Sequence, residues 1–100
     1  MIIVTGSVTA KDGQFEPLRD ACLAHVSRSR TEDGCISHAV HVDAENPLRL
    51  FFFEEWRDLS ALQEHCITPG VAELMGAVRE HAASSEKITT YSAQKAPPQE

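Results

Sequence analysis

Four stretches of the chain have the composition and the alternation of β-strands. They are rich in Val, Ile, Thr and Phe, residues that favour strands, and turn-forming pairs such as Asp12-Gly13 and Asn46-Pro47 lie between them. The predicted strands cover residues 2–10, 35–43, 48–56 and 87–94.

Two other stretches repeat apolar residues at helical spacing. The first predicts a helix over residues 14–31 with one buried face, and Gly34 suits the left-handed conformation that often follows a helix. In the second, a short helix opens at Asp58 or Ser60, and Thr68-Pro69-Gly70 divides it from a further helix that ends near residue 83. The apolar stripes are Phe15, Leu18, Cys22 and Val26 in the first stretch and Leu59, Leu62, Cys66, Val71, Leu74, Met75 and Val78 in the second.

The order of these elements is βαββαβ when the two consecutive helices count as one connection. This order is that of the ferredoxin-like split βαβ arrangement, so we expect an α+β fold with an antiparallel sheet and helices on one face. One hundred residues make one domain. We place it at residues 1–95 and expect the segment 96–100, which has little to bury, to be a disordered tail.

The third predicted strand has large apolar residues on both of its faces. Because side chains alternate along a strand, Leu50, Phe52 and Trp56 share one face while Phe51 and Phe53 share the other. Helices can cover only one face of this sheet, and exposed phenylalanines favour aggregation. We therefore expect a homodimer that packs through the sheets, with a bulged or curled sheet that buries both faces within one chain as the alternative.

Charge and composition exclude several classes of partner. The net charge is −6 and the nine Lys and Arg residues form no cluster, so nucleic acid is not an expected partner. No apolar run reaches the ~20 residues of a membrane span, and the N-terminus lacks the features of a signal peptide. We expect a cytoplasmic protein whose three cysteines, Cys22, Cys35 and Cys66, are reduced and structural.

The sequence motifs indicate neither a metal site nor a nucleotide site. The chain has no Gly-rich phosphate loop, no GxSxG motif and no HExxH motif, so we expect no cofactor and no metal. His38 and His41 point to opposite faces of one strand, and we place His25 and His81 in solvent on the polar flanks of their helices. His65 lies close to the sheet-facing stripe just before a helix break, where it is either a buried structural histidine or a residue that projects into a cavity.

Polar and aromatic residues near the end of the third strand suggest a small apolar pocket with a few polar groups. Glu54 and Glu55 are adjacent and face opposite ways, so one of them points inward near Trp56. A buried carboxylate needs a partner, for which His65 and Arg57 are candidates, although a surface salt bridge would explain the pair equally well.

Three segments of the sequence resemble the antibiotic-biosynthesis-monooxygenase family. They are MIIVTGSVTAKDG, RSRTEDGCISHAVHVDAENP and LFFFEEWRDLSALQEHCITPGV, and the similarity extends from residue 1 to about 91. The most specific parts are Glu32-Asp33-Gly34-Cys35 and the run from Glu54-Glu55-Trp56 to His65 and Thr68-Pro69. The resemblance implies a dimeric ferredoxin-like fold whose sheets pack face to face, with a pocket between sheet and helices in each subunit.

The resemblance also implies an activity. Members of this family oxidise activated phenols or quinols with molecular oxygen and without metal or flavin, and the protein supplies a base, positioning and a dry cavity. On this basis we predict that His65 is catalytic and that the partners are a small aromatic substrate and oxygen. The predicted substrate-binding residues are Phe52, Trp56, Leu62, Met75 and Tyr91.

Some positions differ from particular branches of the family. The haem-degrading branch uses Asn, Trp and His where this chain has Gly6, His65 and Met75, so we do not expect haem degradation. Two alternatives to a monooxygenase are a non-catalytic small-molecule-binding or interaction domain and an isomerase of a small phosphorylated signalling molecule. The isomerase needs basic residues in the pocket, for which Arg49 and Arg57 are the candidates, whereas apolar walls with one base favour oxidation.

Overall fold

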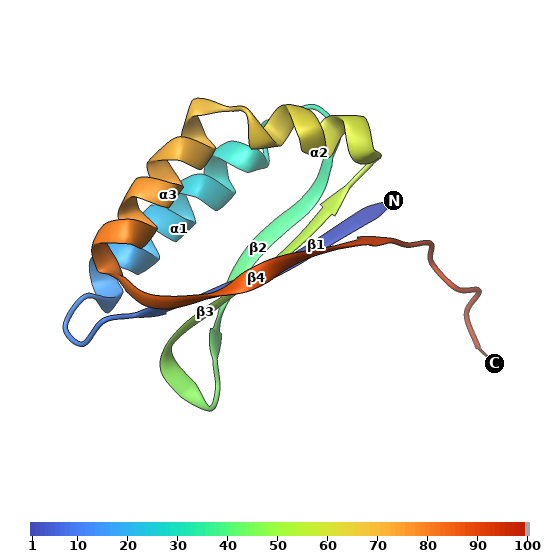
Figure 1. Cartoon of the computed structure of the whole chain (residues 1–100). Coiled ribbons are helices and arrows are strands. Elements are labelled where there is room, and N and C mark those ends of the chain that lie inside the picture. Colours follow the sequence, from blue (N-terminus) through green and yellow to red (C-terminus); the bar gives the residue numbers. More distant parts are fainter. Residues whose placement is uncertain (100) are drawn as a thin grey trace.

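A four-stranded antiparallel sheet carries all the helices on one of its faces (Figure 1), in a computed structural model that describes residues 1–99. The strand order is β2-β3-β1-β4, which confirms the ferredoxin-like α+β fold expected from the sequence. The elements in chain order are β1 (Ile2–Ala10), α1 (Phe15–Ser29), β2 (Cys35–Asp43), β3 (Asn46–Trp56), α2 (Leu59–Cys66), α3 (Pro69–His81) and β4 (Ala82–Ser92).

Three strand boundaries differ from the predicted ones, one of them the end of β4, at Ser92 rather than at residue 94. β3 begins at Asn46 rather than at residue 48, and β4 begins at Ala82, directly after α3, rather than at residue 87. The first half of β4 is polar and exposed at the edge of the sheet, so it lacks the alternation that marks a strand. It still pairs with β1, because backbone hydrogen bonds do not require apolar side chains, and the register between the two strands shifts around Gly6.

The turn after α1 and the start of α2 are held together by local contacts. Gly34 has φ +85°, the left-handed conformation that the sequence predicts for it, and its carbonyl accepts a 2.8 Å hydrogen bond from the backbone N–H of Arg57. Asp58 is the N-cap of α2, and its side chain accepts from the backbone N–H of Ala61 at 2.9 Å. The α1–β2 turn therefore lies directly against the β3–α2 connection.

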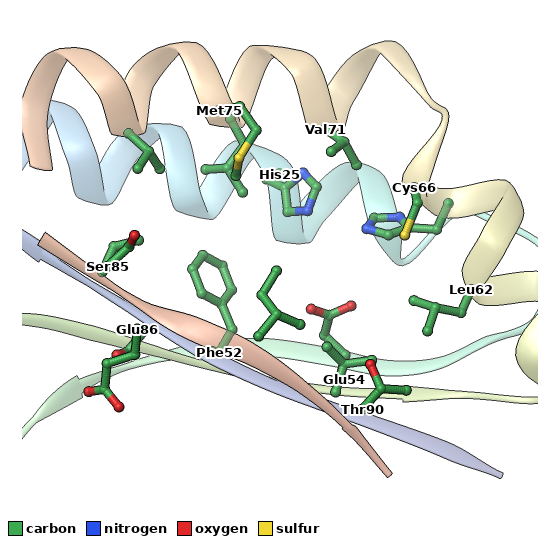
Figure 2. A pocket seen from close by; sticks show the side chains of 18 residues that line it. His25, Phe52, Glu54, Leu62, Cys66, Val71, Met75, Ser85, Glu86 and Thr90 are labelled. Carbon is green, nitrogen blue, oxygen red and sulfur yellow. The ribbon is translucent and has the colours of Figure 1, made fainter. Parts of the chain in front are cut away.

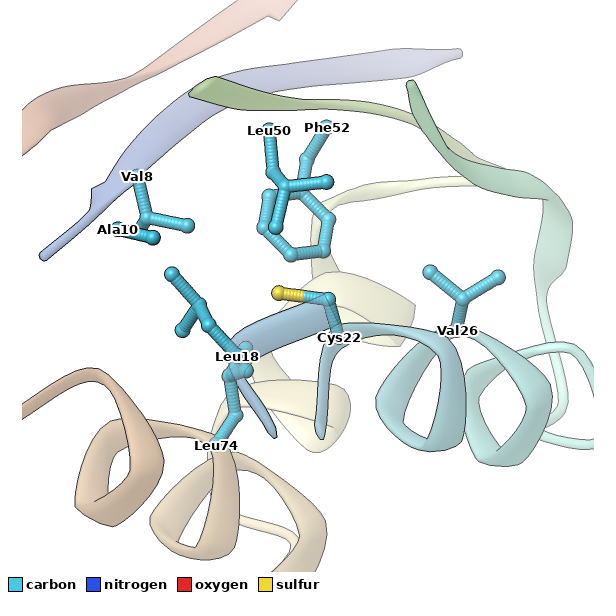
Figure 3. Packing of buried hydrophobic residues seen from close by; sticks show 8 residues of the cluster. All are labelled: Val8, Ala10, Leu18, Cys22, Val26, Leu50, Phe52 and Leu74. Carbon is cyan, nitrogen blue, oxygen red and sulfur yellow. The ribbon is translucent and has the colours of Figure 1, made fainter. Parts of the chain in front are cut away.

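Two groups of buried apolar side chains form the core between the sheet and the helices. The larger packs α1 and α3 against the strands (Figure 3), and the smaller packs α2 against β1 and β3. Each fully buried Leu, Val or Phe contributes about 1.5–3 kcal/mol to folding. The larger group is Val8, Ala10, Leu18, Cys22, Val26, Leu50, Phe52 and Leu74, and the smaller is Val4, Trp56, Ala61 and Leu62.

The opposite face of the sheet carries the other side chains of β3. Leu50, Phe52 and Trp56 are buried under the helices, while Phe53 is 36% exposed and Phe51 is partly buried on the face that no helix covers. The predicted division of β3 into two apolar faces is therefore confirmed.

The start of β1 and the end of β4 lie side by side in the sheet. The terminal amine of Met1 donates to the Ala93 carbonyl at 2.7 Å, and the Ala93 N–H donates to the Met1 carbonyl at 2.8 Å. Residues 93–99 contain no helix or strand and lead away from the domain (Figure 1). Glu100, the last residue of the predicted tail, lies outside the described residues. None of the helices within residues 1–99 is long and apolar enough to cross a membrane.

We expect Gly34→Ala to destabilise the fold more than Gly13→Ala does. Both glycines have positive φ, which costs an alanine about 1–2 kcal/mol, but a Cβ at Gly34 would also collide with the Ala61 side chain, whereas Gly13 faces open space. Overpacking of this kind adds about 1–3 kcal/mol. Urea unfolding of the two variants measures the difference, and equal losses would contradict the close packing of this turn on α2.

Candidate functional site

A cavity of about 240 Å³ lies between the sheet and the helices, with α3 on one side and the β1, β3 and β4 strands on the other (Figure 2). Its walls are mostly apolar, as in sites that hold small organic ligands. The apolar residues that line it are Val4, Val8, Phe52, Leu62, Val71, Leu74, Met75, Val78 and Ile88.

The histidines and the inward-pointing carboxylate of the cavity lie where α1 and α2 meet β3. Here His25 approaches the cavity from α1 and Glu54 from the sheet (Figure 2), and His65 of α2 also lines it. Glu86 also lines the cavity, but its carboxylate turns away from the helices and pairs with Arg49 at 2.8 Å. Glu54 is therefore the carboxylate that reaches the inside of this pocket.

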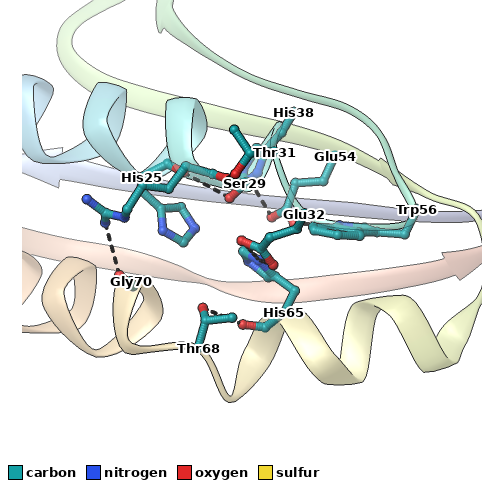
Figure 4. Close-up of polar contacts among 11 residues, drawn as sticks. His25, Ser29, Thr31, Glu32, His38, Glu54, Trp56, His65, Thr68 and Gly70 are labelled. Atoms are coloured by element: carbon teal, nitrogen blue, oxygen red, sulfur yellow. Dashed lines mark hydrogen bonds and ion pairs between the residues drawn. The ribbon is translucent and has the colours of Figure 1, made fainter.

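His65 is held between an aromatic ring and a carboxylate (Figure 4). Its ring centroid lies 4.6 Å from that of Trp56, and its Nδ1 lies 2.9 Å from Oε1 of Glu32. The His65 side chain is buried, while that of Glu32 retains contact with solvent. Because Nδ1 is engaged with Glu32, Nε2 is the nitrogen left for a ligand in the cavity.

Glu54 is the inward-facing member of the predicted carboxylate pair. Its Oε1 accepts a hydrogen bond from Nε1–H of Trp56 at 2.9 Å, and its Oε2 lies 3.6 Å from Nε2 of His38, too far for a hydrogen bond. Burial raises the pKa of the Glu54 carboxyl, and the Trp56 hydrogen bond opposes that rise. The expected partners, His65 and Arg57, are therefore replaced by Trp56 and, more distantly, by His38.

Two further histidines are buried beside His65. His25 is 4% exposed and His38 is 1% exposed, and their ring centroids lie 5.1 Å and 5.9 Å from that of His65. Burial, with the nearby positive charges as smaller causes, lowers the pKa of His25 to about 4 and that of His38 to about 3. Both rings are therefore neutral near pH 7.

Both ring nitrogens of His38 and Nδ1 of His25 are buried without a hydrogen-bond partner among the described residues. Three imidazoles so close together suggest a metal site, but within residues 1–99 no group of three or more His, Cys, Asp or Glu side chains has an arrangement that could hold a metal ion. A nucleophilic cysteine is not supported either. Burial raises the pKa of the Cys22 thiol to about 12 and also raises that of Cys66, which lines the cavity.

Four of the six residues that the sequence assigns to the site meet at this cavity, and two do not. Phe52, Leu62, His65 and Met75 line it. Trp56 is completely buried behind His65 and Glu54 and is not part of the wall.

Tyr91 was expected at the substrate but lies away from the cavity. It pairs with Ile3 on the edge strand β4 and is 50% exposed, whereas its neighbour Thr90, opposite Val4, faces the cavity. The register of β4 on β1 decides which of the two residues points inward, and it turns Tyr91 to the other face of the sheet.

His25 was expected in solvent, and that prediction is wrong. It lies seven residues after Leu18 and three after Cys22, so it belongs to the buried stripe of α1. The helical spacing indicates a buried position for His25, whereas the solvent placement rested on the polarity of its side chain. His81 is also less exposed than expected, because its Nδ1 contacts Gln14 Oε1 at 2.7 Å.

The two arginines considered for a phosphorylated ligand lie outside the cavity. Arg49 is on the uncovered face of the sheet, where it pairs with Asp43 and Glu86. Arg57 is exposed and pairs with Asp33 and Asp58. The residues that line the cavity, as far as the structure describes the chain, include no Arg or Lys.

Comparisons with known proteins agree with this fold. The family model for the antibiotic biosynthesis monooxygenases matches residues 1–77 of the chain. The uncharacterised protein sll1783 of Synechocystis is 30% identical over 90 residues, which cover 90% of this chain and 61% of that protein. The chain thus spans about three fifths of the length of this curated relative.

Solved structures match over the whole domain. The crystal structure of a "putative antibiotic biosynthesis monooxygenase" from Deinococcus radiodurans is 29% identical, with a TM-score of 0.92, and the match covers 100% of this chain and 99% of that one. Protein SO0527 from Shewanella oneidensis is 28% identical, with a TM-score of 0.85, and the match covers 90% and 87% of the two chains.

We expect the free energy of unfolding to fall as the pH drops below 6.5. In the unfolded chain His25 and His38 take up protons near 6.5, but in the folded chain they do so only near 4 and 3, so stability decreases between these values. Each histidine contributes a slope of about 1.4 kcal/mol per pH unit. The raised pKa of Glu54 acts in the opposite direction above 4.5 and reduces the net slope.

Urea unfolding between about pH 4 and 7 tests this expectation. His38→Gln should reduce the slope by the share of one histidine. His41→Gln, which removes an exposed histidine from the same strand, should leave it unchanged. Equal slopes in the two variants would show that His38 takes up its proton normally in the folded state.

Proposed function

Because the chain belongs to the antibiotic biosynthesis monooxygenase family, we propose that it oxidises a small hydroxylated aromatic or quinol with molecular oxygen, without a cofactor. The observation that carries this proposal is the lining of the cavity. The walls are mostly apolar, with hydroxyl groups of Ser and Thr among them, and the ionisable groups that point inward lie together at one end, where His65 and Glu54 are. No Arg or Lys lines the cavity. An aromatic ring suits the walls, and a hydroxyl group suits the polar end.

The polar end offers two contacts to a hydroxylated ring. Nε2 of His65 accepts the proton of the hydroxyl that becomes ionised, and Glu54 accepts a hydrogen bond from a second hydroxyl group where the substrate has one. Phe52 and Met75 hold the ring from the sheet and from α3. Trp56 lies outside the cavity wall. Its ring packs on His65 and its indole N–H donates to Glu54, so it positions both polar groups.

The proposed reaction needs only a base and a dry cavity from the protein. His65 removes the hydroxyl proton, and the electron-rich ring then reduces oxygen by one electron and combines with it to form a carbon-bound peroxide. Loss of the proton from that carbon and cleavage of the O–O bond give a carbonyl group and hydroxide. The hydroxide takes back the proton from His65, so substrate and oxygen yield a quinone and water.

A phosphorylated substrate is not supported by this cavity. An isomerase of such a molecule would need a cation to neutralise the phosphate, and Arg49 and Arg57 both face away. The buried histidines, His25 and His38, are neutral and cannot replace them.

The proposal is tested by oxygen consumption with hydroxyanthrone and naphthohydroquinone, corrected for their oxidation without protein. We expect His65→Ala to lower kcat by about 10²-fold, the usual effect of losing a general base. His41→Ala removes an exposed histidine and should have no effect. Full activity of the His65 variant would assign the proton transfer to another group.

We also propose that the chain is a homodimer whose sheets pack face to face through Phe51 and Phe53. In support, no helix covers this face, on which Phe53 is 36% exposed. Two adjacent large aromatic residues on a face without a helix favour contact with a second copy of the sheet.

We expect Phe53→Glu to give monomers or insoluble protein, because a carboxylate cannot be buried in an apolar interface without a partner. Sedimentation velocity at micromolar concentration measures the change. The exposed Ile67 of the α2–α3 connection, which is 84% exposed, provides the control substitution Ile67→Glu. A wild-type protein that sediments as a monomer would refute the dimer.

A further inference from the structure

We propose that Glu32 is a positioning residue for His65: it fixes the imidazole in the tautomer that carries the proton on Nδ1, so that Nε2 faces the cavity as a proton acceptor. This inference rests on the proposed role of His65 as the base. It adds a residue from outside the cavity, because Glu32 belongs to the turn between α1 and β2 and is absent from the cavity wall.

The contact between the two side chains determines the tautomer. Nδ1 of His65 lies 2.9 Å from Oε1 and 3.2 Å from Oε2 of Glu32, so both carboxylate oxygens face the same ring nitrogen (Figure 4). A carboxylate has acceptors only, and therefore the hydrogen in this contact belongs to Nδ1. The neutral ring then has its lone pair on Nε2, as a general base requires.

Neighbouring contacts hold both partners in place. The indole of Trp56 lies against the His65 ring at an interplanar angle of 37°, and Thr68 Oγ1 donates to the His65 carbonyl at 2.8 Å. The Glu32 backbone is fixed by hydrogen bonds to Ser29 at 3.0 Å and from Cys35 at 3.2 Å. With the ring and the turn both restrained, the carboxylate is held at Nδ1.

Glu32 also borders a second cleft, of about 390 Å³, which adjoins the cavity at His25. This cleft is formed by the end of α1 and the start of α3, and Glu32, Arg28 and Thr68 are among the residues that line it. Figure 4 places Glu32 over His65, which itself lines the first cavity. His65 thus borders the apolar cavity and Glu32 the second cleft, with the contact between the two side chains joining them.

This arrangement also balances the charge that the base acquires. When Nε2 takes a proton from a hydroxyl, the O–H bond breaks, an N–H bond forms and the ring becomes an imidazolium. The groups that face it from the other packed elements are His25 on α1, His38 on β2 and Glu54 on β3. The two histidines cannot stabilise a cation. Of the two carboxylates, Glu54 acts without contact, whereas Glu32 lies 2.9 Å from the ring and has the larger effect.

Nitrogen NMR of the ¹⁵N-labelled protein tests the tautomer without any substrate. At about pH 8.5, where imidazoles are neutral, we expect the Nδ1–H form for His65 in the wild type and a shift toward Nε2–H in Glu32→Ala. Asp33→Ala is the matched control, because it removes the neighbouring carboxylate of the same turn, which contacts Arg57 and not His65. If Glu32→Ala does not fold, Glu32→Leu, whose side chain has no hydrogen-bond acceptor, is measured in its place, and a shift toward Nε2–H is again expected.

An Nε2–H tautomer in the wild type would overturn the proposal, as would an Nδ1–H tautomer that persists when Glu32 is replaced. With an active quinol or anthrone, Glu32→Ala should lower kcat by about 10-fold or more, and formate, which can enter by the second cleft, should restore part of the loss. A wild type inactive on these probes would count against the proposed reaction alone, because the tautomer measurement still decides the role of Glu32.

Discussion

The hydrogen bond from the indole N–H of Trp56 to Oε1 of Glu54, at 2.9 Å, joins the apolar core to the polar end of the cavity. Each partner needs the other. A completely buried indole leaves its only donor unsatisfied without an acceptor, and a buried carboxylate loses the water that would stabilise its charge. Both residues lie on the same face of β3, two positions apart, so the strand itself brings them together. The position of His65 follows from this pair, because its ring packs on the indole.

The parts of the fold and of the site that depend on local sequence patterns could be predicted. The alternation of β3 places Leu50, Phe52 and Trp56 on the helix side and predicts that one of two adjacent glutamates points inward, as Glu54 does. The edge strand β4 carries no such signal. Its side chains are polar and its register on β1 shifts partway, so the side to which Tyr91 points depends on a pairing that no local pattern specifies.

The histidine cluster also shows that local patterns do not specify contacts between separate elements. His25 could have been assigned to the core from its position in the stripe of α1, and its residue type misled the prediction. His38 is different, because its surroundings come from the register that places it opposite Glu54 and from His65 on α2, 27 residues further along the chain. Glu32 reaches His65 across 33 residues of chain. A motif can mark such residues as important, but only the packed turn shows that they meet.

The neutral state of His25 and His38 determines how charge can be created in the cavity. An anion that entered would meet no cation, because the apolar walls and the two neutral rings offer none, and its desolvation would go uncompensated. In the proposed reaction the substrate enters as a neutral molecule, and its negative charge forms only when His65 becomes positive. The anion and the cation then arise together as neighbours, and Glu32 stabilises the cation from outside the cavity. For the proposed reaction, such a site favours a hydroxylated aromatic over a molecule already ionised, and its mostly apolar walls suit oxygen, which is itself neutral and apolar.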